Sequence, residues 1–252
     1  MINQKMDASR QMLKVISLYM SKIDLPNITL VSITSIRLNT TVKALKKSMS
    51  GINFGSVKLF TDVDVVDNEI EVVKVPKMDI IEYNRFVIYE LHKYIDTDFA
   101  LQIQDDGYVV NPDMWRDDFL HYDYIGAPWG FTCFYDKYGQ QIKVGNGISI
   151  RSKRLMELPT LKNMPWHPHD GNYNEDAQIC IWNRSLFLDN GMTFAPFELA
   201  KYFSHEEKLI ESFKDGKRTL ITPQGVEYGD IKPFCFHNLL GGENNAQYKI
   251  YE

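Results

Sequence analysis

A short apolar segment near the middle of the chain ends on three side chains that could bind a metal ion or a phosphate group. Residues 99–103 are apolar or amide side chains, and Gln104, Asp105, Asp106 and Gly107 follow them. A buried strand that stops on carboxylates and a glycine commonly holds a cation or a phosphate at the edge of an α/β sheet. We therefore predict chemistry first at this position.

A second acidic pair, Glu175 and Asp176, comes directly before a stretch with apolar residues at Ile179, Ile181 and Trp182. This pattern predicts a helix that has both acids in its first turn. Carboxylates in a first turn usually stabilise the helix dipole, by ~0.3 to 1 kcal/mol. The residues alone indicate no further role for this pair.

His237 ends the segment Pro-Phe-Cys-Phe-His, residues 233–237. Imidazole is a good ligand for transition metals such as Mn²⁺. Its neighbours Phe234 and Phe236 favour a histidine packed in an aromatic core. The sequence alone favours packing over metal binding.

Residues 144–147, Val-Gly-Asn-Gly, read as a loop before a strand at residues 148–150. Two glycines around Asn146 would let a ligand approach the backbone closely, and an ordinary hairpin turn is the competing interpretation. Trp129 could stack on a sugar ring. Residues 166–170, Trp-His-Pro-His-Asp, resemble a metal pair, but the proline and the Gly/Asn-rich sequence that follows favour a mobile loop that covers an acceptor.

The elements that must position these residues alternate between strand and helix. Strands are predicted at residues 28–36, 57–60, 71–75 and 99–103, and helices at residues 40–47, capped by Asn39 or Thr40 and ended by Gly51, and 79–95. Such alternation predicts an α/β fold, with a central mostly parallel sheet flanked by helices. These sheets bind ligands beyond the carboxyl ends of their strands, where Arg37, Asp62 and Asp106 are expected.

Phosphate-binding glycine motifs of the dinucleotide and P-loop types are absent from the sequence. A diphosphate would then have to be held in another way. A divalent cation between carboxylates and the diphosphate is the natural substitute, because Mg²⁺ commonly uses one or two carboxylates together with substrate phosphates.

Composition places broad limits on the protein. The chain has 252 residues, 44% of them hydrophobic and 24% charged, which suits one domain with a sizeable core. Its formal charge of −5 disfavours a nucleic-acid or anionic-membrane partner. Cys133, Cys180 and Cys235 are widely spaced, which predicts reduced core cysteines.

The first 22 residues have no apolar core of the signal-peptide kind, and no later run reaches the ~18 to 20 apolar residues that span a bilayer. We therefore expect a soluble, cytoplasmic protein. Met12, Ile16, Tyr19 and Met20 lie on one face of an expected amphipathic helix, which would pack on the domain or on a second subunit of a homo-oligomer.

Several motifs occur together in the order seen in one family. They are Tyr83 with Asn84, residues 101–106, residues 122–129, residues 144–147 with Ser149 and Arg151, Glu175 with Asp176, residues 200–204 and residues 233–237. The chain thereby resembles a glycosyltransferase-like family of bacteria and viruses that has the type A nucleotide-sugar glycosyltransferase (GT-A) fold. The resemblance covers roughly residues 28 to 240. It implies a single domain with a nucleotide-binding half (25–110) and an acceptor-binding half (111–252), and it leaves the expected N-terminal helix (1–24) outside.

The resemblance implies a metal site. Type A enzymes typically carry Asp-x-Asp where this chain has Gln104, Asp105 and Asp106, and a late histidine that matches His237. Asp106 and His237 are then the expected ligands of Mn²⁺, or of Mg²⁺, and Gln104 could contribute an amide oxygen or bind a ribose hydroxyl. Asp105 should point to the opposite face of the strand, in a donor-binding role or as a turn residue.

The resemblance also implies the remaining roles. Asp176 would be the base that deprotonates the acceptor hydroxyl, with Glu175 in reserve. Asn146 would contact the donor sugar, and Arg151 would meet the diphosphate or form a surface ion pair. The residues expected to bind the base and ribose, or else to cap elements or lie on the surface, are Ser35, Arg37, Asp62 and Asn84.

The expected activity is metal-dependent transfer of a sugar from a nucleoside diphosphate sugar to an acceptor hydroxyl in glycan biosynthesis, with inversion at the anomeric carbon. Two alternatives stay open. One is a catalytically inactive carbohydrate-binding or scaffold protein, which Gln104 in place of an acid favours. The other is a viral-type transferase that glycosylates modified bases in nucleic acid, which the acidic charge disfavours.

Overall fold

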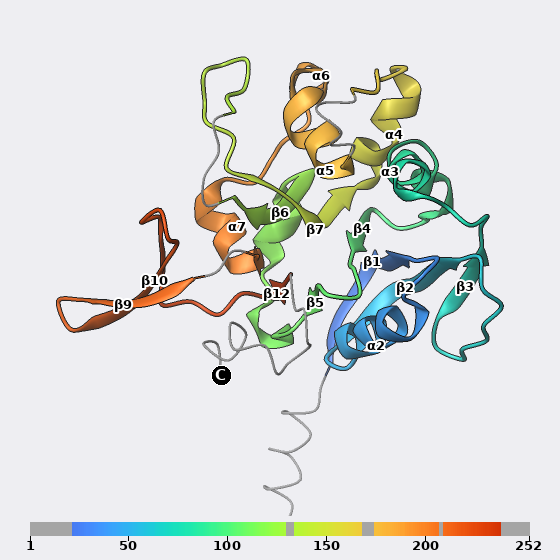
Figure 1. Cartoon of the computed structure of the whole chain (residues 1–252), viewed down its shortest axis with the longest axis horizontal. Helices are drawn as coiled ribbons and strands as arrows, with labels where there is room; N and C mark the ends of the chain where they lie inside the picture. The colour runs from blue at the N-terminus through green and yellow to red at the C-terminus, as the bar shows by residue number, and fades with distance from the viewer. Residues whose placement is uncertain (1–21, 130–133, 168–173, 207–208, 238–252) are drawn as a thin grey trace, which may run out of the picture.

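A computed structural model describes residues 22–129, 134–167, 174–206 and 209–237 (Figure 1). Six strands form the central sheet, in the order β3-β2-β1-β4-β7-β6. Their bounds are β1 Ile23–Ile33, β2 Ile52–Thr61, β3 Glu71–Lys74, β4 Phe99–Gln102, β6 Tyr124–Pro128 and β7 Val144–Ser152. The first four strands in this order pair in parallel, and β7 runs antiparallel to both of its neighbours. The predicted α/β class with a mostly parallel sheet is confirmed.

The centre of the sheet is the buried strand β1. Residues 28–32 are all buried because both faces of the strand are covered, so the strand lacks the alternation of buried and exposed residues that is typical of a half-exposed strand. Leu30 belongs to the core on one face, together with Leu45 of the helix α2 (Leu38–Met49). The next residue, Val31, packs into the core on the other face with Val87 of the helix α3 (Ile80–Tyr89). Helices therefore flank both sides of the sheet.

The remaining helices belong mainly to the second half of the chain. They are α4 Lys153–Leu161, α5 Glu175–Ala177, a π-helical turn Gln178–Trp182, α6 Arg184–Asp189 and α7 Phe197–Phe203, with 3-10 turns at Leu91–Tyr94, Pro112–Met114 and Asp117–His121. None of the helices in the described ranges is long and apolar enough to cross a membrane. Cys180 and Cys235 are buried free cysteines, as predicted, and Cys133 lies outside the described residues.

Two of the predicted helices have different ends from those expected. The helix α2 begins at Leu38, and neither Asn39 nor Thr40 is its cap. The hydroxyls of Thr40 and Thr41 instead donate back to the carbonyl of Arg37, so both threonines lie inside the first turn. The helix expected over residues 79–95 stops at Tyr89, and the 3-10 turn follows it.

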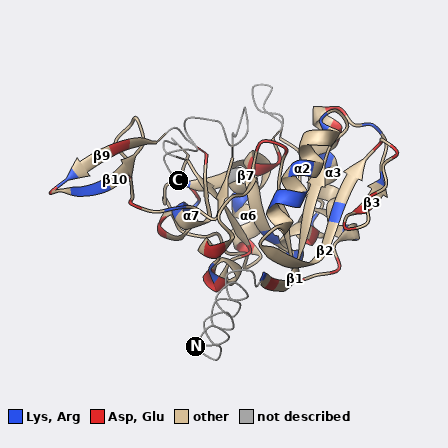
Figure 2. Ribbon diagram, turned by 90° about the horizontal axis from the view of Figure 1, so that it is seen from below, with Lys and Arg blue, Asp and Glu red and all other residues tan. Residues whose placement is uncertain are grey.

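Two smaller three-stranded sheets complete the described fold. One has the order β5-β12-β8, formed by Tyr108–Val109, Cys235–Phe236 and Ser204–His205. The other contains β9 Ile210–Lys214, β10 Lys217–Ile221 and β11 Glu227–Gly229, and its hairpin β9-β10 projects from the body of the molecule (Figure 2). The first of these sheets brings the end of the described chain back to the segment that follows β4.

Two predictions of local structure are corrected. Residues 144–147 do not form a loop but belong to β7, and a Cβ atom at Gly145 would lie 2.6 Å from the Cβ of Cys180. The glycine therefore serves close packing between β7 and the π-helical turn. The N-terminal helix cannot extend to residue 24, because Ile23 already begins β1. The rest of that helix, with its expected role in a homo-oligomer, lies outside the described residues.

Candidate functional site

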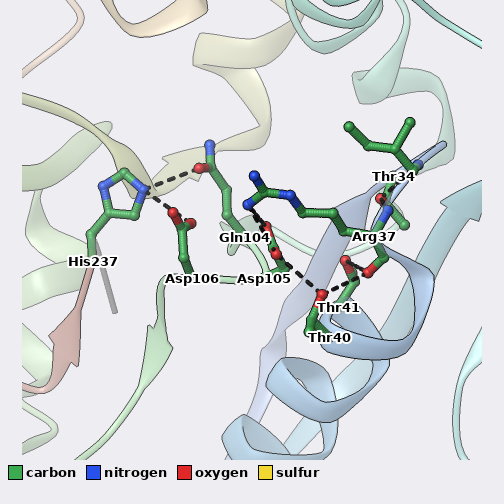
Figure 3. Close-up of polar contacts among 9 residues, drawn as sticks. Thr34, Arg37, Thr40, Thr41, Gln104, Asp105, Asp106 and His237 are labelled. Atoms are coloured by element: carbon green, nitrogen blue, oxygen red, sulfur yellow. Dashed lines mark hydrogen bonds and ion pairs between the residues drawn. The ribbon is translucent and has the colours of Figure 1, made fainter. Parts of the chain in front are cut away.

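The segment after β4 is a tight turn that separates its two carboxylates. The backbone N–H of Gln104 donates to the carbonyl of Gly107 at 2.9 Å, and the N–H of Gly107 donates back at 3.3 Å. Asp105 points toward α2, whereas Asp106 points toward His237 (Figure 3). The expectation that these acids face different sides therefore agrees with the structure, although a turn and not strand alternation separates them.

On the α2 side, Asp105 accepts hydrogen bonds from Thr40 Oγ1 at 3.1 Å and from Arg37 at 3.3 Å. A cavity of about 300 Å³ opens beside this contact. That volume is at the lower end of ligand-binding pockets. Its lining includes Ser35, Arg37, Tyr83, Gln104 and Asp105. Four residues predicted around the nucleotide or the metal thus border one cavity.

Two other residues expected at the nucleotide do not line this cavity. Asp62 directly follows β2, and its Oδ1 atom is buried without a hydrogen-bond partner. Asn84 is 1% exposed. Its side-chain amide donates to the carbonyl of Ile80, and its Oδ1 accepts from the N–H of Glu175 at 2.9 Å. Asn84 therefore ties α3 to α5 and does not face the cavity where it was expected.

On the opposite side of the turn, three side chains meet at one nitrogen atom. His237 Nε2 lies 3.0 Å from Gln104 Oε1 and 3.6 Å from Asp106 Oδ1 (Figure 3). Gly107 permits this arrangement, because a Cβ atom there would lie 2.5 Å from the His237 ring. The prediction that His237 packs in an aromatic core is wrong in part. Its side chain is 15% exposed and reaches the polar corner that it forms with Gln104 and Asp106.

A further carboxylate in this corner was not predicted. Glu206 Oε1 lies 3.3 Å from His237 Nδ1, close enough for an ion pair but not aligned as a hydrogen bond. Burial lowers the pKa of His237, but the carboxylates of Asp106 and Glu206 outweigh burial and raise it to about 10. The same contact with His237 lowers the pKa of Asp106. The sequence offers one signal for Glu206: it comes just after residues 200–204, which belong to the family pattern.

The donor atoms of this corner match a divalent-cation site in part. The described part of the chain contains no cluster of three His, Cys, Asp or Glu side chains placed to hold a metal. Asp106 and His237 nevertheless converge with the amide oxygen of Gln104. A carboxylate, an imidazole and an amide oxygen form a donor set that suits Mn²⁺, provided that substrate oxygens and water fill the remaining positions.

The acidic pair lies in the first turn of α5, as predicted, and both side chains are buried. Glu175 is 4% exposed and forms an ion pair with Arg151 at 3.0 Å. Arg151 is 1% exposed. The alternative of a surface ion pair is therefore wrong, because β7 carries this guanidinium into the interior.

Asp176 lies beside this ion pair and has an unusual proton affinity. Burial, followed by the negative charge of Glu175, raises the pKa of Asp176 to about 8. Glu206 raises it further through its charge, which puts Asp176 within electrostatic reach of the His237 corner. A carboxylate that titrates near neutral pH is suited to accept a proton in catalysis.

The other aromatic and loop predictions have mixed outcomes. Trp129, which could stack on a sugar ring, is half-buried against the core that includes Tyr124. Asn146 belongs to β7. The loop expected to cover an acceptor falls mostly outside the described residues, but its start at His167 is fixed by two hydrogen bonds with Gln178.

The sequence was then compared with known proteins. A model of the family described as "Protein of unknown function (DUF5672)" matches residues 69–223, which is more than half of the chain. The chain belongs to the DUF5672 family. The matched range of this DUF5672 protein contains β4, the turn after it and the acidic pair, whereas β1, β2 and His237 lie outside it. No curated protein matches the sequence.

Two solved structures are similar to this DUF5672 protein at low sequence identity. One is S. aureus TarS 1-349, with 12% identity, a TM-score of 0.39, and coverage of 61% of this chain and 53% of that chain. The other is the apo-form glycosyltransferase GlyE of Streptococcus pneumoniae TIGR4, with 13% identity, a TM-score of 0.41, and coverage of 71% and 46%. The chain thus spans about half the length of each.

Proposed function

We propose that this DUF5672 protein is a metal-dependent glycosyltransferase that uses a nucleoside diphosphate sugar. One observation carries the proposal: three distinct parts of a site converge at the carboxyl edge of the parallel strands. These parts are the cavity beside Asp105, the corner formed by Asp106 and His237, and the buried carboxylate of Asp176. Open α/β sheets bind their ligands at this edge.

Each part has a proposed task. The cavity, with Ser35 and Arg37, would bind the nucleotide, and the Arg37 guanidinium is partly free to meet a phosphate because its side chain is 54% exposed. Asp106, His237 and the amide oxygen of Gln104 would hold Mn²⁺ or Mg²⁺. A cation bound there would neutralise the charge that develops on the leaving diphosphate.

Asp176 would accept the proton of the acceptor hydroxyl while that oxygen attacks the anomeric carbon of the donor sugar. The sugar–diphosphate bond breaks as the new glycosidic bond forms, so we propose inversion at that carbon. Asp176 lies on α5, and no residue of α5 lines the cavity, so the acceptor would approach from the α5 side. We also propose a cytoplasmic location, which the free cysteines Cys180 and Cys235 support.

The test begins with a panel of nucleotide sugars, each assayed for thermal stabilisation of the full chain with and without Mn²⁺. We expect one nucleotide class to stabilise the protein, and only when Mn²⁺ is present. His237→Ala should weaken this binding at least about tenfold, because a metal ligand is lost. His121→Ala, which replaces an exposed histidine, is the matched control and should leave binding unchanged.

Transfer to an acceptor, or hydrolysis of the donor, is then followed by release of the nucleoside diphosphate. Asp106→Ala and Asp176→Ala should each abolish turnover. Of these two substitutions, only Asp106→Ala should also remove the effect of Mn²⁺ on binding of the nucleotide sugar. Turnover that survived in the protein with both substitutions would disprove the assignment.

A second candidate function is binding of a carbohydrate or nucleotide sugar without catalysis. Two features favour it: Gln104 replaces the first acid of the expected motif, and burial raises the pKa of Asp176 to about 8, which would leave most of its carboxyl protonated at neutral pH. This alternative predicts ligand binding with no release of nucleoside diphosphate at any pH up to about 9, where the Asp176 carboxyl is ionised.

A further inference from the structure

Arg151 and Glu175 form a buried ion pair that links three secondary-structure elements beneath the candidate site. The Arg151 guanidinium, on β7, lies 3.0 Å from Glu175 Oε1 on α5. Gln102, at the end of β4, donates to the same oxygen at 3.2 Å. All three residues are at most 4% exposed. A buried pair of this kind is stable only when the remaining polar atoms find partners.

The surrounding residues satisfy much of that requirement. Arg151 Nε donates to Ser149 Oγ at 2.8 Å, and the backbone N–H of Glu175 donates to Asn84 Oδ1. Gln102 also donates to the hydroxyl of Tyr83 at 3.1 Å, and Tyr83 lines the cavity described above. Hydrogen bonds from β4, β7 and α3 therefore fix Glu175 in one place.

These contacts exclude Glu175 as the group that takes a proton from an acceptor. Its Oε1 atom is shared between a guanidinium and an amide, and the residue is 4% exposed. Asp176 is the next residue in the same turn, and its Oδ1 accepts from the N–H of Ala177 at 2.7 Å. Whatever fixes Glu175 therefore also fixes the backbone that carries Asp176.

The ion pair also dominates the charges that Asp176 experiences. Glu175 and Glu206 disfavour its ionised form, and Arg151 favours it. Two neutral groups, the Cys180 thiol and the Tyr124 hydroxyl, face it as well, and burial raises the pKa of each above its ordinary value. Of these groups, only Glu175 and Arg151 form a close ion pair with each other.

We propose that Glu175 and Arg151 are positioning residues, which hold Asp176 in place and set the pH at which its carboxyl ionises. The inference rests on the proposed role of Asp176 as the base. It replaces the earlier expectations that Glu175 is a reserve base and that Arg151 contacts the diphosphate. It also gives Asn84 and Gln102 a task, which is to hold this pair from α3 and β4.

The experiment measures the ionisation of Asp176 without any substrate. The free energy of unfolding is determined across pH for the wild-type chain and for Asp176→Asn, and their difference gives the titration midpoint of Asp176. The same pair of measurements is repeated in the Glu175→Gln background. The amide keeps the oxygen that accepts from Arg151 and Gln102, but it removes the negative charge.

We expect Glu175→Gln to shift the midpoint downward by ~1 pH unit or more, a tenfold change in proton affinity, because Arg151 is then unopposed. Arg151→Gln should shift it upward. If Arg151→Gln does not fold, the double variant with Glu175→Gln replaces the pair by two amides and should shift the midpoint less than Glu175→Gln alone. Glu157→Gln, which removes an exposed partner of Lys153, is the matched control and should cause no shift.

An unchanged midpoint in Glu175→Gln would overturn the inference. The result for the proposed function is separate, because it depends on release of nucleoside diphosphate. A shifted midpoint in a protein with no turnover would show that the pair sets the ionisation of Asp176, and it would count against the glycosyltransferase alone. Where turnover is found, its pH profile should move in the same direction as the midpoint, which a merely structural role would not cause.

Discussion

At the scale of single residues, burial decides what the carboxylates of this protein can do. Asp105 lies in the turn after β4, where Arg37 and Thr40 donate hydrogen bonds to it. Asp176 is 9% exposed, and burial raises its pKa to about 8. The contact with His237 instead lowers the pKa of Asp106, so Asp106 and Asp176 offer different chemistry at neutral pH.

The raised pKa of Asp176 predicts how activity depends on pH. A base must be ionised, so turnover should rise with pH and level off above about 8 to 9. Initial rates of nucleoside diphosphate release at low donor concentration, from about pH 6 to about pH 9.5, would measure this dependence. Asp176→Asn should be inactive throughout this range. A rate that falls as the pH rises toward 8 would contradict the assignment of Asp176 as the base.

At the scale of secondary-structure elements, the ends of the helices determine where the site residues lie. Asp79 caps α3: its side chain accepts from the N–H groups of Ile81 and Glu82, and Glu82 accepts from the N–H of Asp79. This capping box fixes the start of the helix that carries Tyr83 and Asn84. Asp79 and Tyr83 both line the candidate nucleotide cavity.

Removing this cap should destabilise the protein without disturbing the core. We expect Asp79→Ala to lower the free energy of unfolding by about 1 kcal/mol, because two N–H groups lose their acceptor. Asp79→Asn, which keeps an acceptor oxygen, should cost clearly less. Urea denaturation of the three proteins would measure the difference, and equal stabilities for wild type and Asp79→Ala would argue against the capping box.

The sequence predicted the order of strands and helices well, because strong apolar segments such as β1 and β4 are separated by polar turns. It failed where a residue's partner is distant in the chain. The glycines of residues 144–147 looked like a turn, but Gly145 is required by contact with Cys180. Arg151 looked accessible, but its partner Glu175 is 24 positions away. Burial of a charged residue depends on such a partner and not on local pattern.

At the scale of the whole molecule, stability should depend on pH through a second buried group. His205, on β8, is fully buried, and burial lowers its pKa to about 3 although the carbonyl of Lys201 partly opposes this shift. Its ring nitrogen Nε2 lies 2.6 Å from that carbonyl. The folded protein therefore holds His205 neutral, whereas the unfolded chain can protonate it below about pH 6.5.

The direction of the effect follows from proton binding. Below about pH 6.5 the unfolded state binds more protons than the folded state. The contribution of His205 to the free energy of unfolding is therefore fully present above this pH and is lost as the pH falls toward 3. Between about pH 6.5 and pH 4.5 the loss from this group should be about 2 to 3 kcal/mol.

The check is denaturation across this range for the wild type and for His205→Gln, whose amide can also donate to the Lys201 carbonyl. The stability curve of the variant should be flatter. Parallel curves for the two proteins would show that His205 does not carry the effect.

The small sheet β5-β12-β8 has a consequence for the order in which the protein becomes functional. His237 directly follows β12, the middle strand of this sheet, and contacts Gln104, which lies 133 positions earlier. Chains fold from the N-terminal side during synthesis. The proposed nucleotide cavity can therefore form early, whereas the proposed cation corner needs a segment that leaves the ribosome much later. A nascent chain would lack the corner, so the order of synthesis itself would delay activity until β12 has paired with β5 and β8.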